Sequence, residues 1–224
     1  MIVDLNLKGR QVLVVGGGNE AARKVEALLT QDCEVIVVAE RVAESIQGHA
    51  KNGKITLETR SVEEGGLLDS YDRLVLVLAA TDDRELNRRI VLAAKNRGCF
   101  GYAADDPEAS DFSHPAVINI EDTVQVAIST GGKSPLMLKG LREKVEPIIK
   151  NAMDQKILQQ IRLQDRMRTA AKNVLPSPEQ RKQFLTSIRD DAQVNRFLEA
   201  DRLEEAETLA RERLDEFSSS APDE

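Results

Sequence analysis

A glycine triplet stands between an apolar run at 12–15 and sequence that favours a helix: Gly16, Gly17 and Gly18. With Ala21 the glycines form a Gly-x-Gly-x-x-Ala pattern, which allows a backbone to approach a pyrophosphate closely. The free N–H groups and positive dipole end of the following helix also attract phosphates. The pattern alone is common, but a strand before it and a helix after it are the context a dinucleotide site requires. We therefore predict a dinucleotide-binding turn.

Further residues are placed to contact such a cofactor. Asn19 and Glu20 open the helix that follows the glycines. Glu40 lies about 20–25 residues beyond the glycines, where an acidic residue binds the adenosine ribose of NAD. A solvated glutamate at a strand end is an equally good interpretation. Arg41 is suited to the 2′-phosphate of NADP, but we favour NAD.

A second polar pair follows the apolar run 74–78, after the small residues at 79 and 80. These are Thr81 and Asp82, at the carboxyl end of an expected strand. Small residues there leave room for the nicotinamide ribose. Alternatively, Thr81 or Asp82 simply caps the helix expected over about 83–97.

A third polar segment is Thr130-Gly131-Gly132-Lys133-Ser134, which precedes a proline that favours a helix start. Its backbone N–H groups suit a concave anion site, to which the lysine adds charge. A tight strand-to-helix turn explains the two glycines equally simply. His114, in the preceding loop, is a candidate base or transient metal ligand, although a single histidine in a loop is more often neither.

The elements that must position these residues alternate between strand and helix over the first half of the chain. We expect strands at 11–15, 34–39, 54–59, 74–78 and 99–103 and helices at about 19–30, 42–51 and 83–97. This order predicts an α/β fold with a Rossmann-type, doubly wound parallel sheet.

The second half has a different pattern. Two alternating runs, 116–120 and 124–128, predict a hairpin. Helices should then cover 135–173, 178–190 and 192–214, and 218–224 should be disordered. We divide the chain into a dinucleotide-binding domain (1–113), a small β-containing dimerisation and substrate-binding region (114–150) and a helical C-terminal domain (151–224). The last helices are so charged that we expect them to find their apolar partner in another subunit or on a neighbouring domain.

Composition excludes several classes of protein. The net charge of −7 and the absence of Trp argue against a general binder of nucleic acid or anionic membranes. No apolar run approaches the roughly 20 residues of a membrane helix, and no signal peptide is visible. The two cysteines have no metal-ligand spacing, so we expect no resident metal. We predict a soluble, cytoplasmic protein.

Taken together, these segments resemble the siroheme synthase family. The resemblance rests on five motifs in order: Leu7-Lys8-Gly9-Arg10; Val15-Gly16-Gly17-Gly18 with Ala22-Arg23-Lys24; Ala79-Ala80-Thr81-Asp82-Asp83; Asp105-Asp106-Pro107 with Asp111-Phe112 and Pro115-Ala116; and 129–135 with Leu141-Arg142-Glu143-Lys144. The resemblance is strong over about 1–150; beyond that, the helices match in character and position more than in residues. The methyltransferase domain of some members is missing.

The resemblance implies NAD-dependent oxidation of precorrin-2 to sirohydrochlorin. It also implies a homodimer, and it assigns the family's essential aspartate to Asp105. A carboxylate at the carboxyl end of a strand is well placed to accept a proton. Asp106 is then left with the turn before Pro107. Whether the chain also inserts Fe²⁺, as a substrate and not a bound cofactor, stays open.

One alternative belongs to another class, a regulatory NAD-sensing module without catalysis. It explains the glycine turn and the charged helices, but it gives no reason for Asp105 or for the glycine pair at 131 and 132. A DNA-binding repressor is disfavoured because no basic recognition helix is visible.

Overall fold

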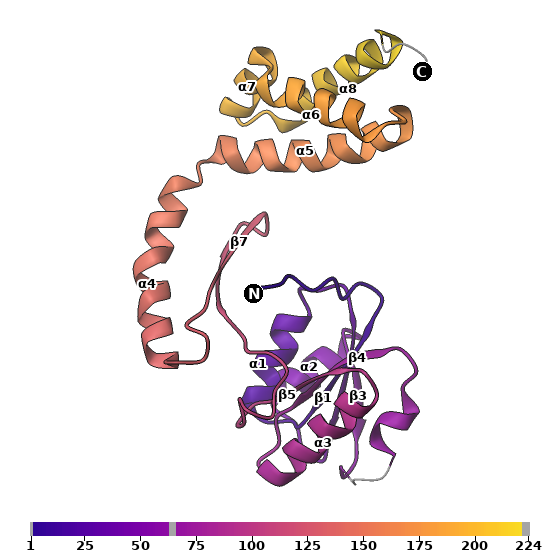
Figure 1. Cartoon of the computed structure of the whole chain (residues 1–224), viewed down its shortest axis with the longest axis vertical. Coiled ribbons are helices and arrows are strands. Elements are labelled where there is room, and N and C mark those ends of the chain that lie inside the picture. The colour runs from indigo at the N-terminus through magenta and orange to yellow at the C-terminus, as the bar shows by residue number, and fades with distance from the viewer. Residues whose placement is uncertain (1, 63–65, 221–224) are drawn as a thin grey trace. The chain divides into compact units, whose positions relative to one another are not determined.

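The computed structural model describes residues 2–62 and 66–220, which divide into two compact units. The first unit is the chain up to His114 together with residues 131–133, and the second is the remainder. Each unit has its own hydrophobic core. Figure 1 shows the elements of both.

The first unit is built on a five-stranded parallel sheet with the strand order β3-β2-β1-β4-β5. Its central strands are apolar on both faces, as expected for a sheet covered on both sides. The predicted Rossmann-type α/β fold is therefore confirmed. The strands are β1 (Gln11–Val15), β2 (Glu34–Ala39), β3 (Thr56–Thr59), β4 (Leu74–Ala79) and β5 (Phe100–Ala103).

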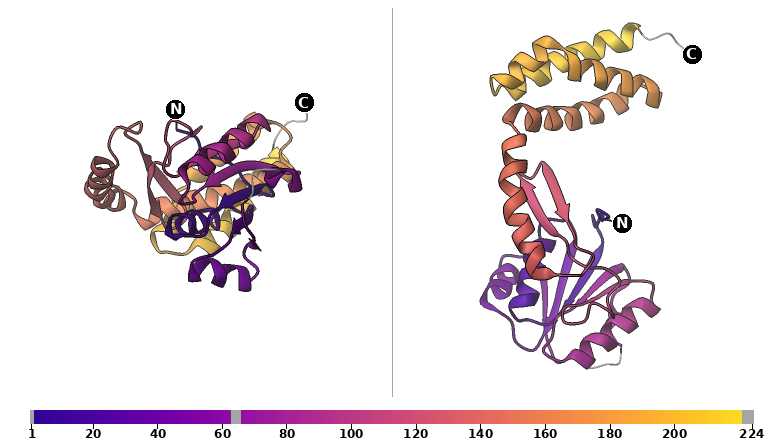
Figure 2. Two further views of the ribbon diagram at one scale, coloured as in Figure 1. Left: turned by 90° about the horizontal axis from the view of Figure 1, so that it is seen from below. Right: turned by 60° about the vertical axis from the view of Figure 1, so that its left-hand side comes forward.

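Alternation along β1 assigns side chains to the two faces. Val12 and Val14 pack in one core with α1 (Asn19–Leu28) and α2 (Glu44–Lys51), whereas Leu13 and Val15 pack in the other with α3 (Arg84–Asn96). The helices of the first unit lie on both sides of its sheet (Figure 2). A short 3-10 helix, η1 (Leu67–Ser70), joins the α3 side. The chain order reverses between β1 and β4, and ligands bind beyond the carboxyl ends of strands at such a point.

The second unit begins with the predicted hairpin, β6 (Ala116–Ile120) and β7 (Val124–Ile128). Glu121 and Asp122 form its turn in the left-handed region, with φ of 48° and 50°. The hairpin packs on α4 (Pro135–Ala152), which starts at the predicted cap Ser134. No residue of α4 is fully buried, and Leu136 and Met137 are 80% and 67% exposed.

Two helices of the expected second half are divided. The stretch 135–173 breaks at Met153 because Asp154 caps a new helix by accepting a hydrogen bond from the Ile157 N–H at 2.8 Å. A second break, at 200–202, divides the expected 192–214 helix. The expected disorder from 218 is wrong for 218–220, which are helical; 221–224 lie outside the described residues. The helices are α5 (Gln155–Val174), α6 (Pro178–Asp190), α7 (Ala192–Glu199) and α8 (Leu203–Ser220).

Helices α5 to α8 enclose a core of their own, which corrects the expectation that their apolar partner lies in another subunit or on a neighbouring domain. Phe184, Leu163 and Met167 are completely buried within it. Most of their apolar side chains fall on the inward faces, and many of the charges outside form ion pairs. Arg166, for example, bridges Glu204 and Glu207 on α8.

Replacing Phe184 with alanine should lower the free energy of unfolding by about 3–5 kcal/mol, because a fully buried ring would leave a cavity. The ring also loses its edge contact with Phe217, at 5.8 Å between centroids. Denaturant unfolding measures the effect. Val174→Ala on the exposed side of α5 is the control and should change stability by no more than about 0.5 kcal/mol. Equal effects of the two changes would contradict the core assignment.

None of the helices in 2–62 and 66–220 is both long enough and apolar enough to cross a membrane.

Candidate functional site

A crevice of about 660 Å³ opens at the carboxyl ends of β1, β2 and β4. The glycine triplet forms one side of it, the segment after β2 a second, and Ala80 with Thr81 a third. This is the position at which doubly wound sheets bind nucleotides.

Two of the three glycines are required by the packing of the turn. Gly16 has a φ of 117°, which L side chains rarely adopt, and a Cβ on it would overlap the carbonyl oxygen of Ala80. A Cβ on Gly17 would overlap the carbonyl oxygen of Arg41. The turn is therefore pressed between the ends of β4 and β2, and only glycine fits at these two positions.

Gly18 differs because a Cβ there would meet nothing within 4 Å. It precedes α1, whose first N–H groups receive no side-chain cap. By contrast, α3, α4, α5, α6 and α7 are all capped by an aspartate or a serine. Open space beside an uncapped helix start fits a pyrophosphate, which would take the place of the cap.

The structure brings most of the predicted cofactor residues to this crevice. Asn19, Glu40, Thr81 and Asp82 line it with the glycines. Glu20 does not: its carboxylate pairs with Arg23 at 2.8 Å and Lys24 at 3.4 Å.

The alternative interpretation, in which Thr81 or Asp82 caps α3, is wrong. Asp83 caps this helix, accepting a hydrogen bond from the Leu86 N–H at 3.0 Å. The Thr81 hydroxyl instead bonds to the Asn87 side chain at 2.7 Å.

Asn87 is a site residue that sequence reasoning missed. It is completely buried, and its Oδ1 accepts from the Thr81 N–H at 3.0 Å. Its Nδ2 donates to the Thr81 carbonyl and to Asp105 Oδ1, both at 3.0 Å. One amide therefore ties the carboxylate of Asp105 to the end of β4, where the crevice opens. The available signal was its spacing, which places Asn87 on the same helix face as Ile90, Val91 and Ala94.

The adjacent aspartates have different environments. Asp105 is exposed, with Asn87 as its partner. Asp106 is buried and bonded to the Arg88 guanidinium, with Arg84 at 3.6 Å and the Ala109 N–H at 3.2 Å. These partners, chiefly Arg88, lower the pKa of Asp106 below its usual range. Asp106 organises the turn, which leaves Asp105 available for chemistry.

The loop at 130–134 is a tight glycine turn before a helix, and it carries an exposed lysine, as the sequence suggested. Gly131 and Gly132 have φ of 62° and 78° and are exposed, as is Lys133. Two hydroxyls are already used locally: Ser134 accepts from the Met137 N–H at 3.3 Å, and Thr130 accepts from the Ser134 N–H at 3.4 Å. Lys133 is thus the exposed charged side chain of the loop, and its role in anion binding stays a prediction.

His114 packs edge-on against two aromatic rings, Tyr102 at 4.7 Å and Phe112 at 5.3 Å between centroids. Part of the residue remains exposed. Desolvation of the ring, assisted by the nearby positive charge of Lys24, lowers the pKa of His114 to about 4. The imidazole is therefore neutral at physiological pH, packed beside Tyr102, over which the Lys24 ammonium lies at 4.5 Å.

Stability should fall as the pH decreases from about 6.5 to about 4. Over this range the unfolded chain protonates His114 while the folded chain does not, because the folded pKa is the lower one. Solvent at the exposed edge moderates the effect. Thermal unfolding of the wild type and His114→Gln measures it: the variant should lose part of the pH dependence. Identical pH profiles would show that His114 does not contribute.

In the described ranges 2–62 and 66–220, no three histidine, cysteine or carboxylate side chains are grouped as metal ligands would be.

A parallel sheet with a glycine crevice at its switch point defines a dinucleotide-binding protein of the Rossmann type. The model of the putative NAD(P)-binding family matches residues 3–116, and the chain belongs to that family. The predicted nicotinamide dinucleotide cofactor is thereby confirmed.

Comparison with individual proteins confirms the resemblance to siroheme synthases. Siroheme synthase of Actinobacillus pleuropneumoniae serotype 7 is 34% identical over 210 residues, which is 94% of this chain and 41% of that protein. Siroheme synthase of Nitrosococcus oceani is 40% identical over 148 residues, 66% of this chain and 31% of that protein. The chain thus spans less than half the length of these relatives.

Among solved structures, one described as SirC, precorrin-2 dehydrogenase, superposes with a TM-score of 0.66 at 25% sequence identity. The alignment covers 95% of this chain and 99% of that chain. The likeness therefore includes both units in their order along the chain.

Proposed function

We propose that this protein oxidises precorrin-2 to sirohydrochlorin with NAD⁺ as the hydride acceptor. The observation that carries the proposal is the Asn87 amide, which holds Asp105 beside Thr81, a residue of the dinucleotide crevice. The likeness to siroheme synthases and to a precorrin-2 dehydrogenase supports the same reaction.

Dehydrogenation removes a hydride from a saturated carbon of the macrocycle and a proton from the atom beside it, which creates a double bond. The bound nicotinamide supplies the hydride acceptor. Asp105 accepts the proton, and Asn87 fixes the direction of its carboxylate. The backbone of Gly131 and Gly132 and the charge of Lys133 bind substrate carboxylates, with His114 as a neutral contact.

Glu40 supports NAD over NADP. It is exposed and lines the crevice at the end of β2, where its carboxylate would accept hydrogen bonds from a ribose and repel a 2′-phosphate. Arg41, which also lines the crevice, would favour NADP because its guanidinium could bind the 2′-phosphate. Titration of the protein with each dinucleotide tests it, with tighter binding of NAD⁺ as the expected result.

The activity test is anaerobic incubation with precorrin-2 and NAD⁺, followed by the absorbance of NADH and sirohydrochlorin. Stoichiometric formation of both is the expected result. Cofactor binding without turnover would favour the NAD-sensing alternative. Adding Fe²⁺ or Co²⁺ to sirohydrochlorin in a second reaction decides whether the same protein also inserts the metal, with Asp105 as the proposed acceptor of pyrrole protons.

We also propose a homodimer associated through the hairpin region 114–150, and we retain 1–113 and 151–224 as the cofactor-binding and helical divisions. The support is α4, whose exposed apolar side chains have no cover within their own unit: Leu136, Met137, Leu141 and Ile148. Such a surface is typical of an interface between subunits. Sedimentation as a monomer at micromolar concentration would contradict it.

A further inference from the structure

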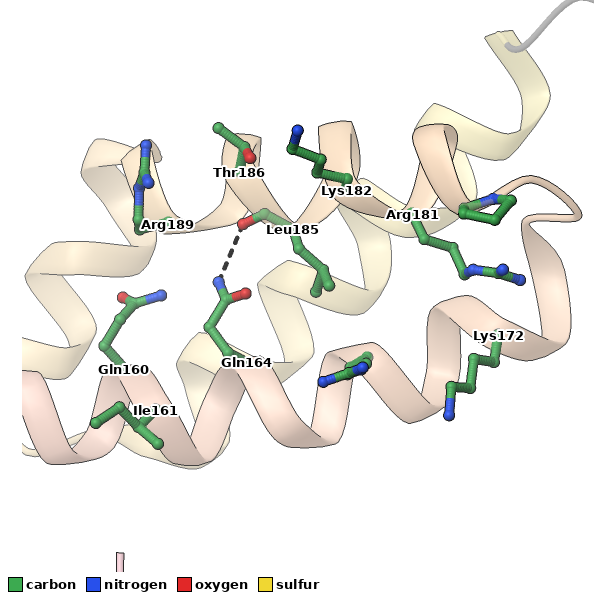
Figure 3. Close-up of a pocket in the computed structure, with 11 residues that line it drawn as sticks. Gln160, Ile161, Gln164, Lys172, Arg181, Lys182, Leu185, Thr186 and Arg189 are labelled. Atoms are coloured by element: carbon green, nitrogen blue, oxygen red, sulfur yellow. Dashed lines mark hydrogen bonds between the residues drawn. The ribbon is translucent and has the colours of Figure 1, made fainter. Parts of the chain in front are cut away.

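A groove of about 660 Å³ runs between α5 and α6, entirely within the second unit. Its volume lies in the range of small-molecule sites. Figure 3 shows Gln160 and Gln164 projecting from α5 toward α6, and the Gln164 amide donates to the Leu185 carbonyl at 3.0 Å. The groove is separate from the dinucleotide crevice, which belongs to the first unit.

Five cations line the groove and no carboxylate does, in a chain with a net charge of −7. They are Arg168, Lys172, Arg181, Lys182 and Arg189. Arg181 bonds to the Leu175 carbonyl at 3.1 Å, and Arg189 pairs with Asp190. Within 2–62 and 66–220, the other three cations have no ion-pair partner.

Other cations of these helices are paired with carboxylates. Arg166 pairs with Glu204 and Glu207, and Arg213 with Asp191 and Glu216. Arg168, Lys172 and Lys182 therefore lack, among the described residues, the carboxylate pairing that Arg166 and Arg213 have. Three cations without an ion-pair partner, together with two more beside the same cavity, attract anions.

A second observation comes from Gln160, which also lines the groove. Both polar atoms of its side-chain amide are shielded from solvent, and neither has a hydrogen-bond partner among the described residues. An unpaired buried amide is costly, so a ligand group that bonds to it would be favoured.

The groove also has apolar surface. Ile161 is 40% exposed, and Leu185 and Pro178 contribute further carbon atoms to the lining. A ligand that fits both features is broad and apolar in its centre and carries several carboxylates at its edge. A single inorganic anion would use the cations and leave the apolar surface exposed.

We propose that the α5–α6 groove is a second binding site for a polycarboxylate tetrapyrrole, outside the site of oxidation. This inference rests on the tetrapyrrole substrate proposed above. Such a site would hold the polycarboxylate macrocycle before or after the reaction. The chemistry also requires neighbouring reactions that supply and consume polycarboxylate tetrapyrroles.

The test uses uroporphyrin, an air-stable porphyrin whose edge is fully carboxylated, in equilibrium fluorescence titrations of the full chain. Lys172→Glu/Lys182→Glu should weaken one class of site by about tenfold or more, because two attractive charges become repulsive. Lys51→Glu/Lys54→Glu is the matched control: it changes the net charge equally, at two exposed lysines that do not line the groove. This control should leave the affinity for uroporphyrin unchanged both at the groove and at the proposed oxidation site. Coproporphyrin, with half as many carboxylates, should bind the groove more weakly.

Equal binding by the groove variant and the control would overturn the inference, as would equal weakening by both. Lys172→Gln/Lys182→Gln, which removes charge without reversing it, should give an intermediate loss. Turnover of precorrin-2 is a separate readout. If the wild type turns over precorrin-2 and the groove variant binds uroporphyrin as tightly as the wild type does, only the proposed groove site is rejected. If the wild type shows no turnover but the groove variant loses uroporphyrin binding, the oxidation is rejected and the polycarboxylate site is retained.

Discussion

Asp105→Asn is expected to lower the rate of precorrin-2 oxidation by about 10²–10⁴-fold, the usual contribution of a positioned proton acceptor. Asparagine has nearly the same shape and keeps an oxygen that can accept the hydrogen bond from Asn87 Nδ2. The fold and the crevice should therefore be unaffected, and only the ability to take a proton is lost. Rapid-mixing measurement of NADH formation under saturating NAD⁺ gives the rate.

The control for this change is Glu108→Gln, at an exposed carboxylate three residues along the chain. It removes the same charge from the same segment and should keep the wild-type rate. Dissociation constants for NAD⁺ should agree among all three proteins. A full rate for Asp105→Asn would remove Asp105 from the mechanism, and an equal loss in Glu108→Gln would show that general charge is responsible.

Asp105 and Asn87 show what the sequence could and could not reveal about the site. Asp105 could be proposed because it follows a strand and matches the aspartate that the family resemblance assigns. Asn87 lies on a helix, in a stretch that alone indicates only an amphipathic face. Its importance comes from two contacts, with Thr81 and Asp105, 6 and 18 residues away. Such pairings depend on how the strands are arranged, which local pattern does not give.

The same distinction holds for the fold. The strands were predictable because an apolar run such as 74–78 has few alternatives in a parallel sheet. The ends of the helices after residue 135 were harder to predict. Asp154 looks like any helical residue in the sequence, and only the structure shows that its side chain caps α5. The independent core of α5–α8 was missed because average charge conceals the spacing of Leu163, Met167 and Ala171 on one face.

Gly17→Ala and Gly18→Ala are both expected to weaken dinucleotide binding, but only Gly17→Ala should also lower stability, although the positions are adjacent. A methyl group on Gly17 would overlap the backbone at Arg41 and Val42, which cannot move without displacing the end of β2. The cost should be at least the roughly 1–3 kcal/mol of an overpacked core, with loss of cofactor binding. Thermal unfolding and NAD⁺ titration of the variant measure both.

Gly18→Ala meets no protein atom, and its φ of −77° suits alanine, so Tm should stay close to that of the wild type. The methyl group would instead occupy the space beside the uncapped start of α1. Dinucleotide affinity should then fall by about tenfold or more, because the pyrophosphate could not approach the helix N–H groups at hydrogen-bond distance. Unchanged affinity for NAD⁺ in this variant would mean that the phosphates do not lie on the glycine turn. A lowered Tm with unchanged affinity would give the open space at Gly18 a structural role instead.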